Sequence, residues 1–126
     1  AARTSSEAVA RTEAAYGRDL ANGAYFWVVV GDDGAVVGVA HACVARDVDA
    51  PQPLELALIY LLEVAKGSGI ADRLLEMAIG DAPAYLWVLA GNDRARGFYR
   101  RHGFAPDGTT KLLENSLVVE ERWVRT

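Results

Sequence analysis

The first apolar pattern in this chain has helical spacing. Thr4 and Glu7 stand three residues apart, as in a capping box at the start of a helix. The apolar stripe that follows this box is Ala8, Thr12, Ala15, Tyr16 and Leu20. Asn22-Gly23 is a typical helix stop, so the sequence predicts a helix that ends before residue 23.

The next pattern is rich in β-branched and aromatic residues. Residues 25–30 and 35–44 have strand composition, and the Gly-Asp-Asp-Gly segment 31–34 between them predicts a hairpin loop. Residues 47–53 contain two prolines and predict a connector. A third strand is predicted over residues 54–63.

Helical and strand patterns alternate through the rest of the chain. A helix after residue 70 is predicted to bury Ala71, Leu74, Leu75 and Ala78, and residues 80–83 end it. Residues 85–89 are continuously apolar, as in a buried central strand. Asn92 can cap a helix over residues 93–102. A last strand is predicted over residues 117–124.

The predicted order of elements is α-β-β-β-α-β-α-β, which favours an α/β (α+β) fold in one domain over residues 1–126. The strand-helix-strand unit from 54 to 89 places two strands parallel through a right-handed crossover. The two strands before it form an antiparallel pair. We therefore expect a mixed, mostly antiparallel twisted sheet with helices on both faces.

Composition and charge narrow the class of protein. The chain has 126 residues, of which 52% are hydrophobic and 24% are charged, as in an ordinary globular domain. A net charge of −4 argues against nucleic acid as a partner. The single cysteine excludes a disulfide within the chain, and one cysteine with two histidines argues against a structural zinc site. With no long apolar run, we expect a cytoplasmic protein without a membrane partner.

The segment Lys66-Gly67-Ser68-Gly69-Ile70-Ala71 joins the third strand to the following helix. A glycine-rich turn at a helix start directs backbone N–H groups and the positive end of the helix dipole at an anion. The order of residues does not fit a P-loop, and Asp72 stands where a dinucleotide fingerprint needs a small residue. A tight turn that binds nothing is the alternative, but the position of the turn favours a phosphate-bearing ligand.

A second motif lies in residues 85–104. After the buried strand come Asn92, Ala95, Phe98-Tyr99 and a closing Gly103-Phe104. This Asn-x-x-Ala-x-x-Phe-Tyr pattern, together with the glycine turn before it, resembles the acyl-CoA-binding part of the GNAT-type N-acetyltransferases. The resemblance is strong over residues 54–106 and holds only in outline over residues 4–53.

The resemblance implies a GNAT-like fold and a set of residues that bind coenzyme A. The amides of residues 67–72 would hold the pyrophosphate, and the strand edge at Leu61 and Leu62 would pair with the pantetheine arm. Lys66 stands where the family usually has Gln or Arg, and it can serve a phosphate only as a point charge. The implied coenzyme-binding residues are Leu61, Leu62, Lys66, Gly67, Ser68, Gly69, Ile70, Ala71, Asp72, Asn92 and Tyr99.

Two side chains are candidates for catalysis. Tyr99 would sit near the thioester sulfur and protonate the leaving thiolate, although its stripe also fits a core aromatic. Glu55 would accept the amine proton, although a solvent-facing edge residue is an equal alternative. His41, Glu63 and water remain competing bases. Cys43 is expected to be buried and inert.

The resemblance implies an N-acetyltransferase that moves an acetyl group from acetyl-CoA, its cosubstrate, to an amine by direct attack and without a metal. The acceptor would be a small-molecule amine, a protein N-terminus or a lysine. The alternatives are a non-catalytic acyl-CoA-binding regulatory module of the same fold and a nucleotide-binding α/β protein. On family grounds we also expect that the sequence begins after the family's first strand and helix, and that residues 117–124 could form a homodimer.

Overall fold

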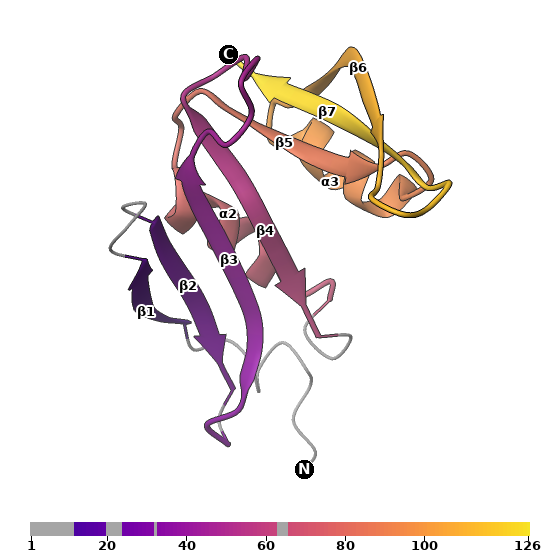
Figure 1. Ribbon diagram of the computed structural model, residues 1–126. Helices are drawn as coiled ribbons and strands as arrows, with labels where there is room; N and C mark the ends of the chain where they lie inside the picture. Colours follow the sequence, from indigo (N-terminus) through magenta and orange to yellow (C-terminus); the bar gives the residue numbers. More distant parts are fainter. Residues whose placement is uncertain (1–11, 20–23, 32, 63–65) are drawn as a thin grey trace. The chain divides into compact units, whose positions relative to one another are not determined.

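The computed structural model describes residues 12–19, 24–31, 33–62 and 66–126, and these contain seven strands and two helices (Figure 1). In chain order they are β1 (Thr12–Asp19), β2 (Ala24–Val30), β3 (Val36–Val44), β4 (Leu54–Leu61), α2 (Ile70–Ile79), β5 (Ala84–Leu89), α3 (Asp93–Arg101), β6 (Ala105–Leu112) and β7 (Val119–Arg125). None of the helices in these ranges is long and apolar enough to span a membrane.

The strands form a mixed, mostly antiparallel sheet, as the sequence predicted. Their hydrogen-bonded order is β1-β2-β3-β4-β5-β7-β6. β4 and β5 run parallel, with Glu55 opposite Tyr85, while the pairs β1/β2, β2/β3, β5/β7 and β6/β7 are antiparallel. Contacts between residues divide the chain into two compact units, and the first two residues of β4 belong to the second unit.

The first unit comprises residues 1–44 and 56–81. Its core is formed where α2 packs on β2 and β3. The buried side chains of this core are Val29, Val37, Ala40, Ile70 and Leu74, and the partly buried Trp27, Ile59, Leu61 and Ala78 pack against them. A Cβ at Gly38 would lie 2.6 Å from Leu61 Cδ1 and 3.0 Å from Leu74 Cδ1. The close packing of β3, β4 and α2 therefore requires the smallest residue there.

The second unit comprises residues 45–55 and 82–126, with α3 packed against β7. Trp123 of β7 is fully buried, and the guanidinium groups of Arg96 and Arg100 lie 5.7 and 5.1 Å from its ring centroid. Asn92 Oδ1 accepts a hydrogen bond of 3.1 Å from the Ala95 N–H. The predicted cap at the start of this helix is therefore confirmed.

The predicted first helix is wrong over residues 12–19. This segment is β1, which pairs antiparallel with β2. Helical periodicity over one stretch of chain is a weak signal, and pairing with a neighbouring strand outweighs it here. The capping box at Thr4 and Glu7, together with the end of the stripe at Leu20, lies outside the described residues.

The sequence reasoning also missed β6, and it began the last strand at residue 117 where the structure begins β7 at Val119. β6 is an edge strand of the sheet, and nearly all of its residues are exposed. It therefore lacks the alternation of apolar and polar residues that marks a half-buried strand, and its Pro106 and Gly108 read as turn residues. The predicted third strand ends at Leu61, and Glu63 lies outside the described residues.

Candidate functional site

The glycine turn of the first unit has the backbone conformation that the sequence suggested. Gly67 and Gly69 have φ of +79° and +84°, a left-handed region that side chains rarely adopt. Gly69 is the N-cap of α2, and no atom of the described residues lies within 4 Å of a Cβ placed at either glycine. The backbone at this helix start is therefore open to a ligand, while buried Ile70 anchors the turn to the core.

The polar groups around this turn are arranged at the positive end of α2. Ser68 Oγ accepts a hydrogen bond of 3.4 Å from the Ile70 N–H. Lys66 is exposed and precedes the turn, and Asp72 lies in the first turn of the helix. The first amides of a helix have no partners within it, so the turn can bind an anion through its backbone.

The end of β4 offers main-chain groups on the side away from β3. The Leu62 N–H donates to the Val37 carbonyl of β3 at 2.8 Å. Because successive residues of a strand direct their N–H groups to opposite sides, the Leu61 N–H points away from β3. The Leu61 side chain packs in the α2 core, and the Leu62 side chain is exposed.

Tyr99 of α3 is a buried aromatic residue of the second unit. Its ring is 5.5 Å from that of Phe98 and 6.0 Å from that of Phe104, and 8% of the residue is exposed. Burial raises the pKa of Tyr99 to about 12. No hydrogen bond of the hydroxyl group is found among the described residues. The phenol is therefore protonated at neutral pH.

Glu55 is buried in the second unit, so the solvent-facing alternative is wrong. Three groups of Arg46 donate hydrogen bonds to Glu55. The backbone N–H and Nε donate to Oε1 at 3.2 and 3.0 Å, and Nη2 donates to Oε2 at 2.7 Å. The Tyr85 hydroxyl lies 3.1 Å from the same Oε1. Burial by itself raises the pKa of Glu55. The hydrogen bonds and positive charge of Arg46 and the hydrogen bond of Tyr85 outweigh this effect, so the pKa of Glu55 lies below its ordinary value. Such a carboxylate is a poor proton acceptor.

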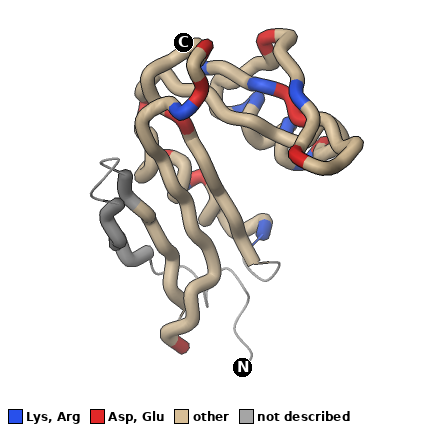
Figure 2. The backbone as a smooth tube through the Cα atoms, in the orientation of Figure 1, with Lys and Arg blue, Asp and Glu red and all other residues tan. Residues whose placement is uncertain are grey.

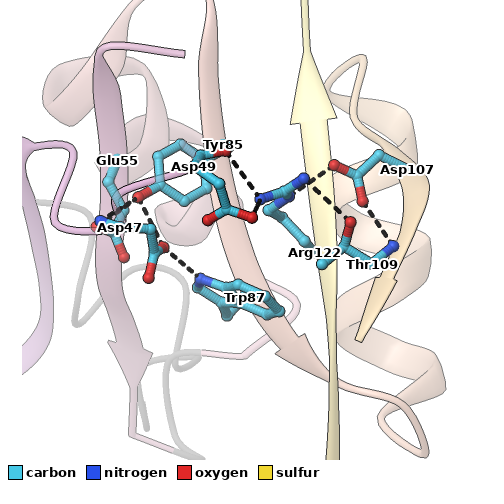
Figure 3. A network of polar contacts seen from close by, with 8 residues as sticks. All are labelled: Asp47, Asp49, Glu55, Tyr85, Trp87, Asp107, Thr109 and Arg122. Atoms are coloured by element: carbon cyan, nitrogen blue, oxygen red, sulfur yellow. Dashed lines mark hydrogen bonds and ion pairs between the residues drawn. The ribbon is translucent and has the colours of Figure 1, made fainter. Parts of the chain in front are cut away.

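A polar network that the sequence reasoning missed surrounds Glu55 (Figure 3). Asp47 Oδ2 accepts hydrogen bonds from the Tyr85 hydroxyl at 2.8 Å and from Trp87 Nε1 at 2.9 Å. Burial raises the pKa of Asp47, but these bonds and the Lys111 and Arg46 charges lower it below its ordinary value. The network fastens the connector between β3 and β4 to β5.

Arg122 of β7 extends this network to β6. It is 8% exposed, and its Nε donates to Asp107 Oδ2 at 2.6 Å. Its other nitrogens donate to Asp49 and to Thr109 Oγ1. A sequence signal existed, because Tyr85 and Trp87 are the two residues of the apolar strand that carry polar atoms and point to one face.

The remaining candidates lie in the first unit or outside the described residues. His41 is half-buried on β3, and its ring stacks on that of Phe26 with centroids 4.1 Å apart. Cys43 is buried, as expected. Glu63 is not among the described residues. The turn residues belong to the first unit, and Glu55, Asn92 and Tyr99 belong to the second.

Comparison with known proteins identifies the family. Residues 2–104 match the model of the acetyltransferase (GNAT) family, and the chain belongs to that family. A probable N-acetyltransferase of Mycobacterium tuberculosis, Rv2775, is 29% identical over 101 residues, which are 78% of this chain and 57% of the relative. The chain thus spans little more than half of that relative's length.

Solved structures show the same fold. Nourseothricin acetyltransferase is 22% identical with a TM-score of 0.63, over 81% of this chain and 64% of that one. NAA60 of Arabidopsis thaliana, in complex with a bisubstrate analogue, is 17% identical with a TM-score of 0.68, over 81% of this chain and 75% of that one. The same plant protein is similar in its complex with acetyl-CoA. The predicted GNAT fold is therefore confirmed.

Proposed function

We propose that this chain binds acetyl-CoA and transfers its acetyl group to an amine by direct attack. The observation that carries the proposal is the left-handed turn at Gly67 and Gly69. It opens the backbone at the start of α2, directly after β4, in a chain of the GNAT family. Such a turn suits the pyrophosphate of coenzyme A, because backbone N–H groups and the helix dipole both favour a doubly charged anion.

In this proposal the amides of residues 67–72 hold the pyrophosphate and Lys66 adds a positive charge. The pantetheine arm lies along β4 like an added strand and accepts a hydrogen bond from the Leu61 N–H. A neighbouring N–H of the same strand polarises the thioester carbonyl. The amine nitrogen attacks the carbonyl carbon, the C–S bond breaks, and the thiolate leaves with the electron pair.

We assign Tyr99 to the departing sulfur. A phenol with a pKa of about 12 keeps its proton at neutral pH and donates it as a hydrogen bond to the developing thiolate. Burial raises the pKa of a thiol as well, which brings the two groups closer in acidity. Asn92 acts through the cap that fixes the start of α3.

We do not assign the amine proton to Glu55. Its two oxygens are held by Arg46 and Tyr85, and its lowered pKa disfavours protonation. Glu55 instead acts as a positioning residue for the start of β4. The amine proton leaves to water or to His41.

Both oxygens of Glu55 already accept hydrogen bonds, and this favours one second candidate function, an acyl-CoA-binding module without catalysis. Such a module needs the turn but no base. A broad panel of amines distinguishes the two candidates. If the protein binds acetyl-CoA but releases no thiol with any of these amines, the result would support the module over the transferase.

The first experiment is a calorimetric titration with acetyl-CoA and, separately, ATP. We expect binding that is selective for acetyl-CoA and that weakens at least tenfold in Gly69→Val. Gly34→Val is the matched control, because Gly34 has the same φ of +84° and equally open space at its Cβ but lies in the β2–β3 hairpin. Equal loss in both variants, or tighter binding of ATP, would contradict the proposal.

A further inference from the structure

Arginine residues are frequent on α3 and β7 of the second unit, among the blue segments of Figure 2. They are Arg94, Arg96, Arg100 and Arg101 of α3 and Arg122 and Arg125 of β7. Arg125 is half-buried, and its guanidinium reaches two other segments of this unit. Its Nε and Nη2 donate to the Ala82 carbonyl at 3.2 and 2.7 Å, and its Nη1 donates to the His102 carbonyl at 3.3 Å. Arg125 therefore ties the segment before β5 to the end of α3.

The end of α3 fixes the backbone of Tyr99. Gly103 has a φ of +89°, and its N–H donates to the Arg100 carbonyl at 3.1 Å. The next N–H, that of Phe104, donates to the Tyr99 carbonyl at 3.0 Å. These two hydrogen bonds and the left-handed glycine form a Schellman motif, a common way for a helix to end. Tyr99 thus lies in the last turn of α3, and a shift of the helix end moves it.

Arg125 supports this helix end in three ways. Its Nη1 serves the His102 carbonyl at the C-cap, where helix carbonyls lack partners within the helix, and its charge favours the negative end of the helix dipole. Its side chain passes so close to Gly103 that a Cβ there would lie 3.2 Å from Arg125 Cδ. Its guanidinium carbon lies 5.0 Å from the centroid of the Phe104 ring. That ring is buried and meets the Tyr99 ring edge-on, so Arg125 holds both the backbone and a ring neighbour of Tyr99.

Tyr99 depends on this support because its hydroxyl group has no hydrogen bond among the described residues. The position of its oxygen is therefore set by the backbone of α3 and by the rings of Phe98 and Phe104. A proton donor must lie within hydrogen-bond distance of the group that it serves. A misplacement of about 1 Å can lower a rate about a hundredfold, even when its cause lies far from the reacting atoms.

We propose that Arg125 is a positioning residue for the acetyl transfer proposed above, on which this inference rests. Arg125 holds the end of α3 so that the Tyr99 hydroxyl meets the departing sulfur, and it does not itself contact the reacting atoms. The planar fork of an arginine suits this task because it serves two carbonyl groups at once, whereas a lysine offers a single nitrogen on a flexible stem. The alternative is a structural role, in which Arg125 stabilises the second unit without affecting the rate through Tyr99.

The test is a double-mutant cycle between Arg125→Met and Tyr99→Phe, with kcat measured by thiol release from acetyl-CoA. The acceptor is the fastest amine of a panel that includes phenethylamine, spermidine and a Leu-Gly-Gly-Gly peptide. Methionine keeps an apolar stem beside Gly103 and removes the fork. We expect Arg125→Met to lower kcat about tenfold in the wild-type background, with the Kd for acetyl-CoA nearly unchanged. In Tyr99→Phe the same change should lower kcat by less than about twofold, because the two residues act as one unit.

Two further variants separate positioning from stability. Arg125→Lys keeps the charge but not the fork; it should lower kcat about threefold, and it serves as the test if Arg125→Met does not fold. Arg96→Met is the matched control. Arg96 is also half-buried, its guanidinium lies 5.7 Å from the centroid of the buried Trp123 ring, and it binds the carboxylates of Asp93 and Glu121. These partners lie at the start of α3 and on β7, so Arg96→Met should lower stability but keep kcat within about twofold.

The acetyl-CoA affinity and the rate of Tyr99→Phe separate the ways of failing. If Tyr99→Phe lowers kcat but the Arg125 variants do not, or if Arg125→Met lowers kcat equally in both backgrounds, the inference about Arg125 alone is overturned. A fall of the same size in Arg96→Met also overturns it. If the wild-type protein does not bind acetyl-CoA, or releases no thiol with any amine of the panel, the proposed function fails, and this inference with it.

Discussion

At the scale of single residues, the candidate site separates into groups that can react and groups that hold the fold. Tyr99 and Glu55 were the two catalytic candidates that the sequence suggested, and their surroundings differ. The Tyr99 hydroxyl has no hydrogen-bond partner among the described residues, whereas both oxygens of Glu55 are occupied. A buried polar atom with no partner is costly, so it often marks a site that meets a ligand.

Replacing Tyr99 by Phe tests this separation. We expect kcat to fall about a hundredfold, in the range for loss of a general acid, with the Kd for acetyl-CoA nearly unchanged. Unfolding by urea should show no loss of stability, because the change removes a buried hydroxyl that has no partner. Steady-state kinetics with unaltered turnover would refute the role of Tyr99 at the sulfur.

Replacing Glu55 by Gln tests the structural role. We expect the free energy of unfolding at pH 7 to fall by about 1–2 kcal/mol. The loss is no larger because the Arg46 side chain is 64% exposed, so that water screens its charge. The pKa of Glu55 is lower in the folded state than in the unfolded state. The stabilisation is therefore complete above the ordinary glutamate pKa and disappears as the pH falls through the folded-state value.

Urea unfolding at pH 7 and at pH 3 measures this difference. The gap between wild type and Glu55→Gln should narrow at the lower pH. Glu76→Gln, a change at an exposed carboxylate on α2, is the control and should matter little at either pH. A gap that is independent of pH would rule out the ion pair as its cause.

At the scale of elements, the sequence predicted the local signals and the pairings of β2 with β3 and of β4 with β5, but it missed the strands β1 and β6. The glycine turn, the cap at Asn92 and the buried strand 84–89 depend on neighbouring residues, and all three are present. β1 and β6 depend on partners elsewhere in the chain. The network around Glu55 was missed for the same reason, because Arg46 and Tyr85 are far apart in the chain and meet only at Glu55.

Gly38 offers a test at this scale, because it lies where β3, β4 and α2 pack together. A Cβ there meets the ends of two flexible leucine side chains, so we expect Gly38→Ala to destabilise the protein by about 1–2 kcal/mol. It should also weaken acetyl-CoA binding, since Leu61 must move. Gly97→Ala in α3, with open space at its Cβ, is the control and should be neutral or stabilising. Full acetyl-CoA affinity in a destabilised Gly38→Ala protein would argue against a role for β4 at Leu61.

At the scale of the whole molecule, the open question is whether the two units unfold together. The sequence predicts one domain over residues 1–126. Residues 54–55 of β4 belong to one compact unit and residues 56–61 to the other. A strand that is shared in this way loses its hydrogen bonds in both units when either one unfolds. We therefore expect a single cooperative transition.

Hydrogen exchange with and without acetyl-CoA tests this expectation. A ligand at one hundred times its Kd stabilises the folded state by about 2.7 kcal/mol, and it protects every amide that exchanges only through the same unfolding event. The turn that we propose for acetyl-CoA lies in the first unit, so the slowest amides of β3 should gain this protection. If the chain unfolds as one domain, the slowest amides of β5 and β7 in the second unit should gain the same amount. Protection that stays confined to the first unit would mean that the units unfold separately. As a control, Gly69→Val should remove the gain in protection in both units.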